Sequence, residues 1–126
     1  MNIPEQLKYS KSHEWVKTDG DTITMGISEF AISQLGDITL VELPEAGSTV
    51  TAGDSLGTIE SVKAVSDLYS PVTGRVLKLN ETLEETPENV NDDCYGKGWM
   101  LKIEVTASSD DLMDSTSYQE YLDSLD

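Results

Sequence analysis

Short runs of alternating apolar and polar residues fill most of the chain, and turn-forming residues separate them. The runs at 14–17 and 22–25 alternate on either side of the Asp19-Gly20-Asp21 turn, which predicts a β-hairpin. Further runs bounded by Gly, Pro or Asp lie at 38–43, 48–50, 55–62, 64–69, 75–79 and 100–105. Strands of this length and spacing predict a mainly β fold, either a small sandwich or a barrel.

Two segments instead carry helical signals. Ser28 is a suitable N-cap for a short helix near 28–35, which Gly36 would end. The tail predicts an amphipathic C-terminal helix near 109–125, with Ser108 and Asp111 forming a start that resembles a capping box. The apolar face of this helix contains Tyr118, Leu122 and Leu125. We expect the helix to pack on the sheets, and a docking role for a partner is the alternative.

Length and charge narrow the choice of function. The 126 residues fit one domain, and 24 acidic against 8 basic residues give a formal net charge of −16. A surface of this charge repels phosphate backbones and anionic lipids, so we expect no nucleic-acid or membrane partner. It favours proteins that present basic docking patches, because such attraction raises association rates.

The cysteine content and the N-terminus indicate the compartment. Cys94 is the only cysteine, so no disulfide can form within the chain. The first residues have neither the basic nor the apolar region of a secretory signal. We therefore expect a cytoplasmic protein.

The residues that usually build a catalytic centre are scarce. His13 is the only histidine, and no Ser/His/Asp set, metal-spaced His/Cys cluster or phosphate-binding glycine loop is present. A histidine beside Trp15 in a strand is more often packed or hydrogen-bonded than catalytic. We expect a non-catalytic protein.

Lys63 is the main candidate for chemistry. It lies between two predicted strands in a hairpin near 55–79, where its amine would be exposed on a rigid support among small and medium-sized neighbours. These are the requirements for acylation by another enzyme, which would remove the charge and extend a flexible arm from a fixed root. An unmodified, solvated lysine is the alternative.

The residues around Lys63 resemble the lipoyl-attachment signature of the glycine cleavage H-protein family. The signature spans 60–67, Glu-Ser-Val-Lys-Ala-Val-Ser-Asp, and 70–74, Ser-Pro-Val-Thr-Gly. Further segments that resemble this family lie at 8–10, 12–16, 26–31, 35–38, 41–44, 87–91 and 95–99. The resemblance therefore covers nearly the whole chain, including the acidic C-terminal helix.

The resemblance implies a fold, a cofactor and a set of partners. The fold is a lipoyl-domain-like β-sandwich, a barrel-sandwich hybrid, formed by residues 1–126 as a single carrier domain. Lipoic acid would be attached covalently to Lys63. The carrier would take the aminomethyl group of glycine from glycine decarboxylase (P protein) to the aminomethyltransferase (T protein), and dihydrolipoyl dehydrogenase (L protein) would reoxidise the arm. A lipoyl or octanoyl ligase or transferase would attach the group, with Glu60 contributing to recognition.

The same resemblance implies a cleft that shelters the loaded arm. Ser12, Glu14 and Asp67 occupy the matching positions. A carboxylate in such a cleft would pair with an ammonium group, and exclusion of water would prevent hydrolysis. Two positions depart from the family: Phe30 stands where many relatives have histidine, which removes a polar contact, and Cys94 stands where proline is usual, which loosens that turn.

Several other readings stay open at this point. An H-like protein could instead serve as a lipoyl donor or relay in lipoate assembly or protein modification, or the chain could be an unmodified protein-binding module. Biotin carriers prefer methionine on both sides of the lysine, whereas Val62 and Ala64 flank it here. Lipoyl domains of 2-oxo-acid dehydrogenases usually have aspartate before the lysine and lack the terminal helix.

Overall fold

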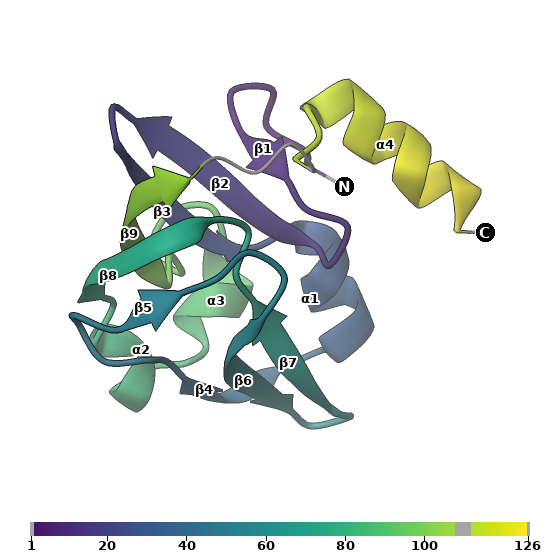
Figure 1. The fold of residues 1–126 in the computed structure, drawn as a ribbon. Coiled ribbons are helices and arrows are strands. Elements are labelled where there is room, and N and C mark those ends of the chain that lie inside the picture. The colour runs from purple at the N-terminus through teal and green to yellow at the C-terminus, as the bar shows by residue number, and fades with distance from the viewer. Residues whose placement is uncertain (1, 108–111, 126) are drawn as a thin grey trace.

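Two antiparallel sheets form the body of the protein (Figure 1). The computed structural model describes residues 2–107 and 112–125. The six-stranded sheet has the order β1 (Lys8–Tyr9), β2 (Glu14–Asp19), β3 (Thr22–Ile27), β9 (Leu101–Ala107), β8 (Thr73–Leu79) and β5 (Thr49–Val50). The three-stranded sheet has the order β4 (Ile38–Glu42), β6 (Ser55–Ser61) and β7 (Val65–Tyr69). The mainly β, lipoyl-domain-like sandwich expected from the sequence is confirmed.

The main core lies between the two sheets. Its buried side chains come from alternate positions of strands in both, as the two-residue period of a strand requires. The six-stranded sheet contributes Val16, Ile23, Met25, Val76, Leu101 and Ile103, and the three-stranded sheet contributes Ile38, Val41, Ile59 and Leu68. Among the described residues, no helix has the length and apolar character needed to cross a membrane.

Short helices close the ends of this sandwich. α1 (Glu29–Leu35) begins where the Ser28 hydroxyl accepts a hydrogen bond from the Ala31 N–H, as predicted, and it ends at Gly36. α2 (Thr82–Glu85) and α3 (Asn89–Asp92) occupy the polar segment before β9 and place Leu83 and Val90 in the core.

The C-terminal helix is shorter than the sequence predicted. The prediction near 109–125 is wrong at its start, because α4 spans Ser115–Ser124. The Asp114 carboxylate caps it by accepting a hydrogen bond from the Ser117 N–H at 2.8 Å. Before this cap the chain is extended, since the backbones of Met113 and Tyr9 exchange two hydrogen bonds of 2.7 and 2.8 Å. The predicted capping pair of Ser108 and Asp111 lies outside the described residues.

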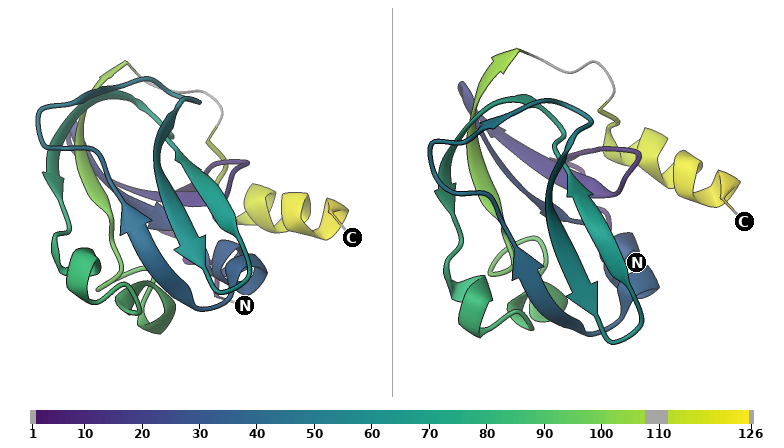
Figure 2. Two further views of the ribbon diagram at one scale, coloured as in Figure 1. Left: turned by 90° about the horizontal axis from the view of Figure 1, so that it is seen from below. Right: turned by 60° about the horizontal axis from the view of Figure 1, so that its bottom comes forward.

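The predicted attachment hairpin is also shorter. Its two strands are β6 and β7, so it spans 55–69 rather than 55–79. After Tyr69 the chain turns at Ser70, whose hydroxyl donates to the Val72 carbonyl at 2.5 Å, and β8 joins the other sheet. In Figures 1 and 2 the hairpin of β6 and β7 lies at the edge of the molecule opposite β8 and β9.

A second, aromatic cluster joins the two ends of the chain on the outside of the larger sheet. The rings of Tyr9 and Tyr118 stack with centroids 4.5 Å apart, and Leu7, Trp15 and Leu122 are buried beside them. The prediction that the C-terminal helix packs on the sheets is confirmed, although α4 extends past their edge (Figure 2). Leu125, expected on the apolar face, is 49% exposed.

We expect Tyr118→Phe to destabilise the protein, because the Tyr118 hydroxyl joins two segments. It lies 2.7 Å from the Ser28 hydroxyl and 2.9 Å from His13 Nδ1. Removing it leaves both groups without this partner, which costs about 1–3 kcal/mol in the free energy of unfolding. Tyr121→Phe is the control, because that hydroxyl makes only an exposed 3.3 Å hydrogen bond to the Lys11 carbonyl. Urea denaturation of both variants measures the difference, and equal stabilities would contradict the role of Tyr118.

Candidate functional site

The tip of the β6–β7 hairpin is a three-residue connection with Lys63 at its centre. The Ser61 hydroxyl organises this tip. It accepts hydrogen bonds from the N–H groups of Lys63 (3.2 Å) and Ala64 (3.1 Å), and the Ser61 N–H donates to the Ala64 carbonyl at 2.8 Å. A serine that binds nearby backbone groups in this way favours a turn. The backbone under Lys63 is therefore ordered even though its side chain is exposed.

Two exposed apolar side chains lie beside Lys63 in the sequence. Val62 and Val65 are each 68% exposed, which is unusual for side chains of this type. Within residues 2–107 and 112–125 the only ion pair joins Arg75 and Glu104, so no described carboxylate lies within ion-pair distance of the Lys63 amine. The arrangement presents an accessible primary amine that an acylating enzyme could reach.

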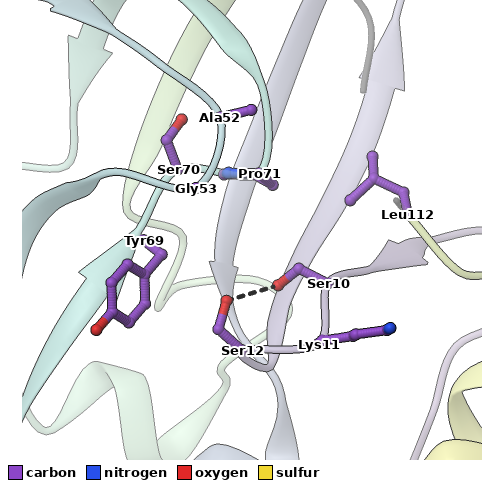
Figure 3. A pocket seen from close by; sticks show the side chains of 9 residues that line it. All are labelled: Ser10, Lys11, Ser12, Ala52, Gly53, Tyr69, Ser70, Pro71 and Leu112. Atoms are coloured by element: carbon purple, nitrogen blue, oxygen red, sulfur yellow. Dashed lines mark hydrogen bonds between the residues drawn. The ribbon is translucent and has the colours of Figure 1, made fainter. Parts of the chain in front are cut away.

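A separate hollow of about 500 Å³ lies at the other end of β7 (Figure 3). One wall comes from the segment between β1 and β2, with Ser10, Lys11 and Ser12. The opposite wall comes from the turns at 52–53 and 69–71, and Leu112 lies on the side nearest the C-terminal segment. In Figure 3 the hydroxyls of Ser10 and Ser12 point toward each other across 3.3 Å.

Glu14 lies behind these two serines and is 2% exposed. Its Oε1 accepts hydrogen bonds from the hydroxyls of Ser10 (2.6 Å) and Ser12 (2.5 Å), and its Oε2 accepts a longer one from the Tyr69 N–H (3.4 Å). Burial disfavours the charged carboxylate and raises the pKa of Glu14 to about 7, although these hydrogen bonds act in the opposite direction. A carboxyl group of this kind would gain most from a cationic ligand, whose charge would stabilise its ionised form.

Asp67 is more loosely connected to this group. It is exposed on β7, and its carboxylate accepts a 3.4 Å hydrogen bond from the hydroxyl of Tyr69. Since the Tyr69 N–H also faces Glu14, Tyr69 links the two carboxyl groups. Ser12 and Glu14 are thus in direct contact, whereas Asp67 reaches them through Tyr69.

Lys63 and Glu60 both lie near the hairpin tip, away from this hollow. Glu60 is half-buried on β6 and pairs with Val65 on β7. The predicted site residues therefore form two groups, one at the tip and one at the hollow, and β7 runs from the first to the second.

His13 is a packed residue rather than part of the hollow, as expected. Its backbone has a φ of 73°, which is uncommon for a side chain other than glycine. Its ring lies 4.5 Å from that of Phe30, and burial lowers its pKa. Phe30, at the position where many members of the family have histidine, thus packs against His13.

Cys94 is also a packed residue. Its carbonyl accepts a 2.9 Å hydrogen bond from Trp15 Nε1. Burial, followed by the nearby carboxylates of Glu29 and Asp93, raises the pKa of its thiol to about 12. A thiol in this state is inert, so Cys94 offers no nucleophile.

The roles of Ser10, Ser61 and Tyr69 were not predicted from the sequence. Ser61 had a readable signal, because a serine two residues before the centre of a tight turn often binds its backbone. The contact of Ser10 with Glu14 follows from the turn between β1 and β2, where the Ser10 N–H donates to the Glu14 carbonyl at 2.9 Å. Tyr69 had no local signal, since it meets Glu14 across two sheets.

Comparison with known proteins gives one consistent result. Residues 7–125 match the family model described as Glycine cleavage H-protein. A protein of Listeria monocytogenes named glycine cleavage system H protein is 53% identical over 125 residues, covering 98% of this chain and all of the relative. One of the same name from Staphylococcus haemolyticus is 51% identical over 124 residues, covering 97% and 98% of the two chains.

A solved structure agrees with these relatives. The crystal structure of a glycine cleavage system H protein from Mycobacterium marinum superposes with a TM-score of 0.91. The two sequences are 35% identical, and the match covers 96% of this chain and 99% of the other. Both the sequence and the fold therefore match along nearly the whole length.

Proposed function

This chain belongs to the glycine cleavage H-protein family, and from that premise we propose that it is the lipoyl-bearing carrier of the glycine cleavage system, with Lys63 as its attachment residue. The observation that carries the proposal is the exposed Lys63 at an ordered hairpin tip, where Ser61 binds the backbone and no described carboxylate pairs with the amine. The whole chain would work as one carrier domain.

The residues present fit a lipoyl group on Lys63. An amide linkage removes the lysine charge, and this costs no described ion pair. Exposed Val62 and Val65 provide an apolar surface beside the root of the arm. When bound, the lipoyl group supplies the dithiolane sulfur that carries the aminomethyl group of glycine.

Ser12, Glu14 and Asp67 would hold the amino group of this cargo. The Glu14 carboxyl is buried and bound by two serine hydroxyls, so its geometry is fixed before any ligand arrives. An ammonium group entering the hollow would favour ionised Glu14, and the pair would be stronger here than in water. The exposed carboxylate of Asp67 would contribute at the outer edge. Exclusion of water from the hollow would then slow hydrolysis of the cargo.

The partners of the proposed carrier are the decarboxylase, the aminomethyltransferase and dihydrolipoyl dehydrogenase, together with a lipoyl or octanoyl ligase or transferase. Glu60 would contribute to recognition by this last enzyme, because it lies on β6 just before the tip. The net charge of −16 would attract basic docking surfaces on these partners. The carrier itself would catalyse no reaction. Its matched relatives are bacterial, which supports a cytoplasmic location.

The test is the covalent state of the protein purified from its native source. Intact mass and peptide mapping should find one lipoyl amide, located on Lys63. A glycine–bicarbonate exchange assay with the decarboxylase should then show activity that depends on this modified chain, which a lipoyl relay outside glycine cleavage would not support. An unmodified Lys63 in cells that lipoylate their other carrier proteins would contradict the proposal and favour a binding module.

A further inference from the structure

The connection between α1 and β4 has a conformation that only glycine tolerates. Gly36 has φ 78° and ψ −147°, a region that other residues almost never populate. Asn91, on α3, binds both sides of this connection. Its Nδ2 donates to the Gly36 carbonyl at 2.9 Å, and its Oδ1 accepts from the Ile38 N–H at 2.9 Å. The segment Gly36–Ile38 is therefore fixed to the body of the protein by one side chain.

This fixed segment contacts the hairpin tip at two points. The Val62 N–H donates to the Asp37 carbonyl at 3.1 Å. The Lys63 side chain lies over Gly36, so that a β-carbon on Gly36 would come within 3.3 Å of Lys63 Cε and 3.8 Å of Nζ. The aliphatic part of the exposed Lys63 side chain thus contacts Gly36, which has no side chain to obstruct it.

We infer that the segment Gly36–Ile38, held by Asn91, is a seat that fixes the direction in which the Lys63 side chain leaves the hairpin. Asn91 and Gly36 are positioning residues in this inference, which rests on the proposed attachment at Lys63. A free lysine side chain has many rotamers, and ordering one on binding costs about 0.5–1.5 kcal/mol. If the first part of the Lys63 side chain is already ordered, the enzyme that modifies Lys63 has less conformational entropy to remove on binding.

The seat should act on recognition of the lysine rather than on the chemistry. In that step the free Lys63 amine attacks the carbonyl carbon of an adenylate-activated lipoyl group. The amide C–N bond forms, the bond from this carbon to the phosphate oxygen breaks so that AMP leaves, and the proton of the amine passes to solvent. All activating groups belong to the ligase. Loss of the seat should therefore raise the KM for this protein and leave kcat unchanged.

Asn91→Asp tests the inference with a small change. The aspartate keeps an acceptor for the Ile38 N–H but places a carboxylate oxygen against the Gly36 carbonyl. We expect the unmodified variant to show faster hydrogen exchange at the Val62 amide and a higher KM with a lipoate ligase, lipoate and ATP. Since one hydrogen bond contributes about 1 kcal/mol, each effect should be about five- to tenfold. Gly36→Ala adds a β-carbon at this position, and it should also raise the exchange rate of the Val62 amide and the KM of the ligase.

Asn80→Asp is the matched control. Asn80 is 6% exposed, and its Nδ2 donates to the carbonyls of Lys97 (2.9 Å) and Trp99 (2.7 Å). Its Oδ1 accepts from the Thr82 N–H (3.3 Å) and hydroxyl (2.6 Å), so the side chain also holds two segments together. The Asn80→Asp variant should be less stable than the wild type, but the hydrogen exchange of the Val62 amide and the KM of the ligase should not change. Equal effects of the two Asn variants, or no effect of Asn91→Asp, would overturn the inference. If the wild-type chain is not lipoylated at Lys63, the proposed function fails, while Val62 exchange still tests the seat.

Discussion

Lys63→Arg should leave a folded protein that carries no lipoyl group and supports no glycine–bicarbonate exchange. Arginine keeps the positive charge and much of the aliphatic length, but its guanidinium stays protonated and cannot be acylated under these conditions. Because Lys63 is exposed and forms no described ion pair, the free energy of unfolding should change by less than about 0.5 kcal/mol. Intact mass after incubation with a lipoate ligase and the exchange assay measure the two losses.

Lys78→Arg is the control for this variant, because Lys78 is also an exposed lysine in a β-structure. It should be lipoylated at the same rate as the wild type. Residual lipoyl mass on Lys63→Arg would show that another lysine is the attachment residue, and the assignment would then have to be abandoned.

The stability of the wild-type protein should fall between pH 4.5 and pH 7 because of Glu14. Burial raises the pKa of this carboxyl from 4.5 to about 7, so the folded state keeps a proton that the unfolded state releases across this range. The unfolded state therefore binds fewer protons, and the free energy of unfolding decreases as pH rises. A shift of this size corresponds to about 3 kcal/mol of stability, which is fully present below pH 4.5 and lost above pH 7.

Glu14→Gln should remove this pH dependence, because the amide stays neutral. Urea denaturation at half-unit steps from pH 4.5 to 8 would compare it with the wild type and with Glu42→Gln, which changes an exposed carboxylate. Glu14→Gln should become more stable relative to both as pH increases. Each variant loses one carboxyl group, so the repulsion among the remaining acidic groups is alike in the two variants, and parallel curves for them would show that the pKa of Glu14 is not raised in the folded state.

The sequence predicted those parts of the fold that depend on neighbours in the chain. The hairpin of β2 and β3 and the N-cap of α1 at Ser28 follow from alternation and from a side chain that binds its own helix. The start of α4 could not be predicted in this way. Met113 pairs with Tyr9 at the other end of the chain, and this long-range pairing overrides the helical pattern before Ser115.

In the candidate site, too, the features set by local sequence could be predicted and those set by long-range contacts could not. Lys63 could be predicted because its hairpin and flanking motif are local. Local sequence did not indicate that Tyr69 lies between Glu14 and Asp67, since the contact of Tyr69 with Glu14 joins β7 to β2 of the other sheet. The support of Gly36 by Asn91 spans 55 residues and had no signal in a single sequence.

The pairing of the two chain ends also sets an order for biosynthesis. The loop that carries Ser12 leaves the ribosome well before its support, because His13 at its centre is held by the Tyr118 hydroxyl, 105 residues later. A ribosome releases about 5–20 residues per second, so this loop waits several seconds for its support. The loop beside the hollow is therefore held in its final position only after Tyr118 has been made. Lys63 is made before Tyr118, so the proposed lipoylation of the hairpin does not have to wait for this support.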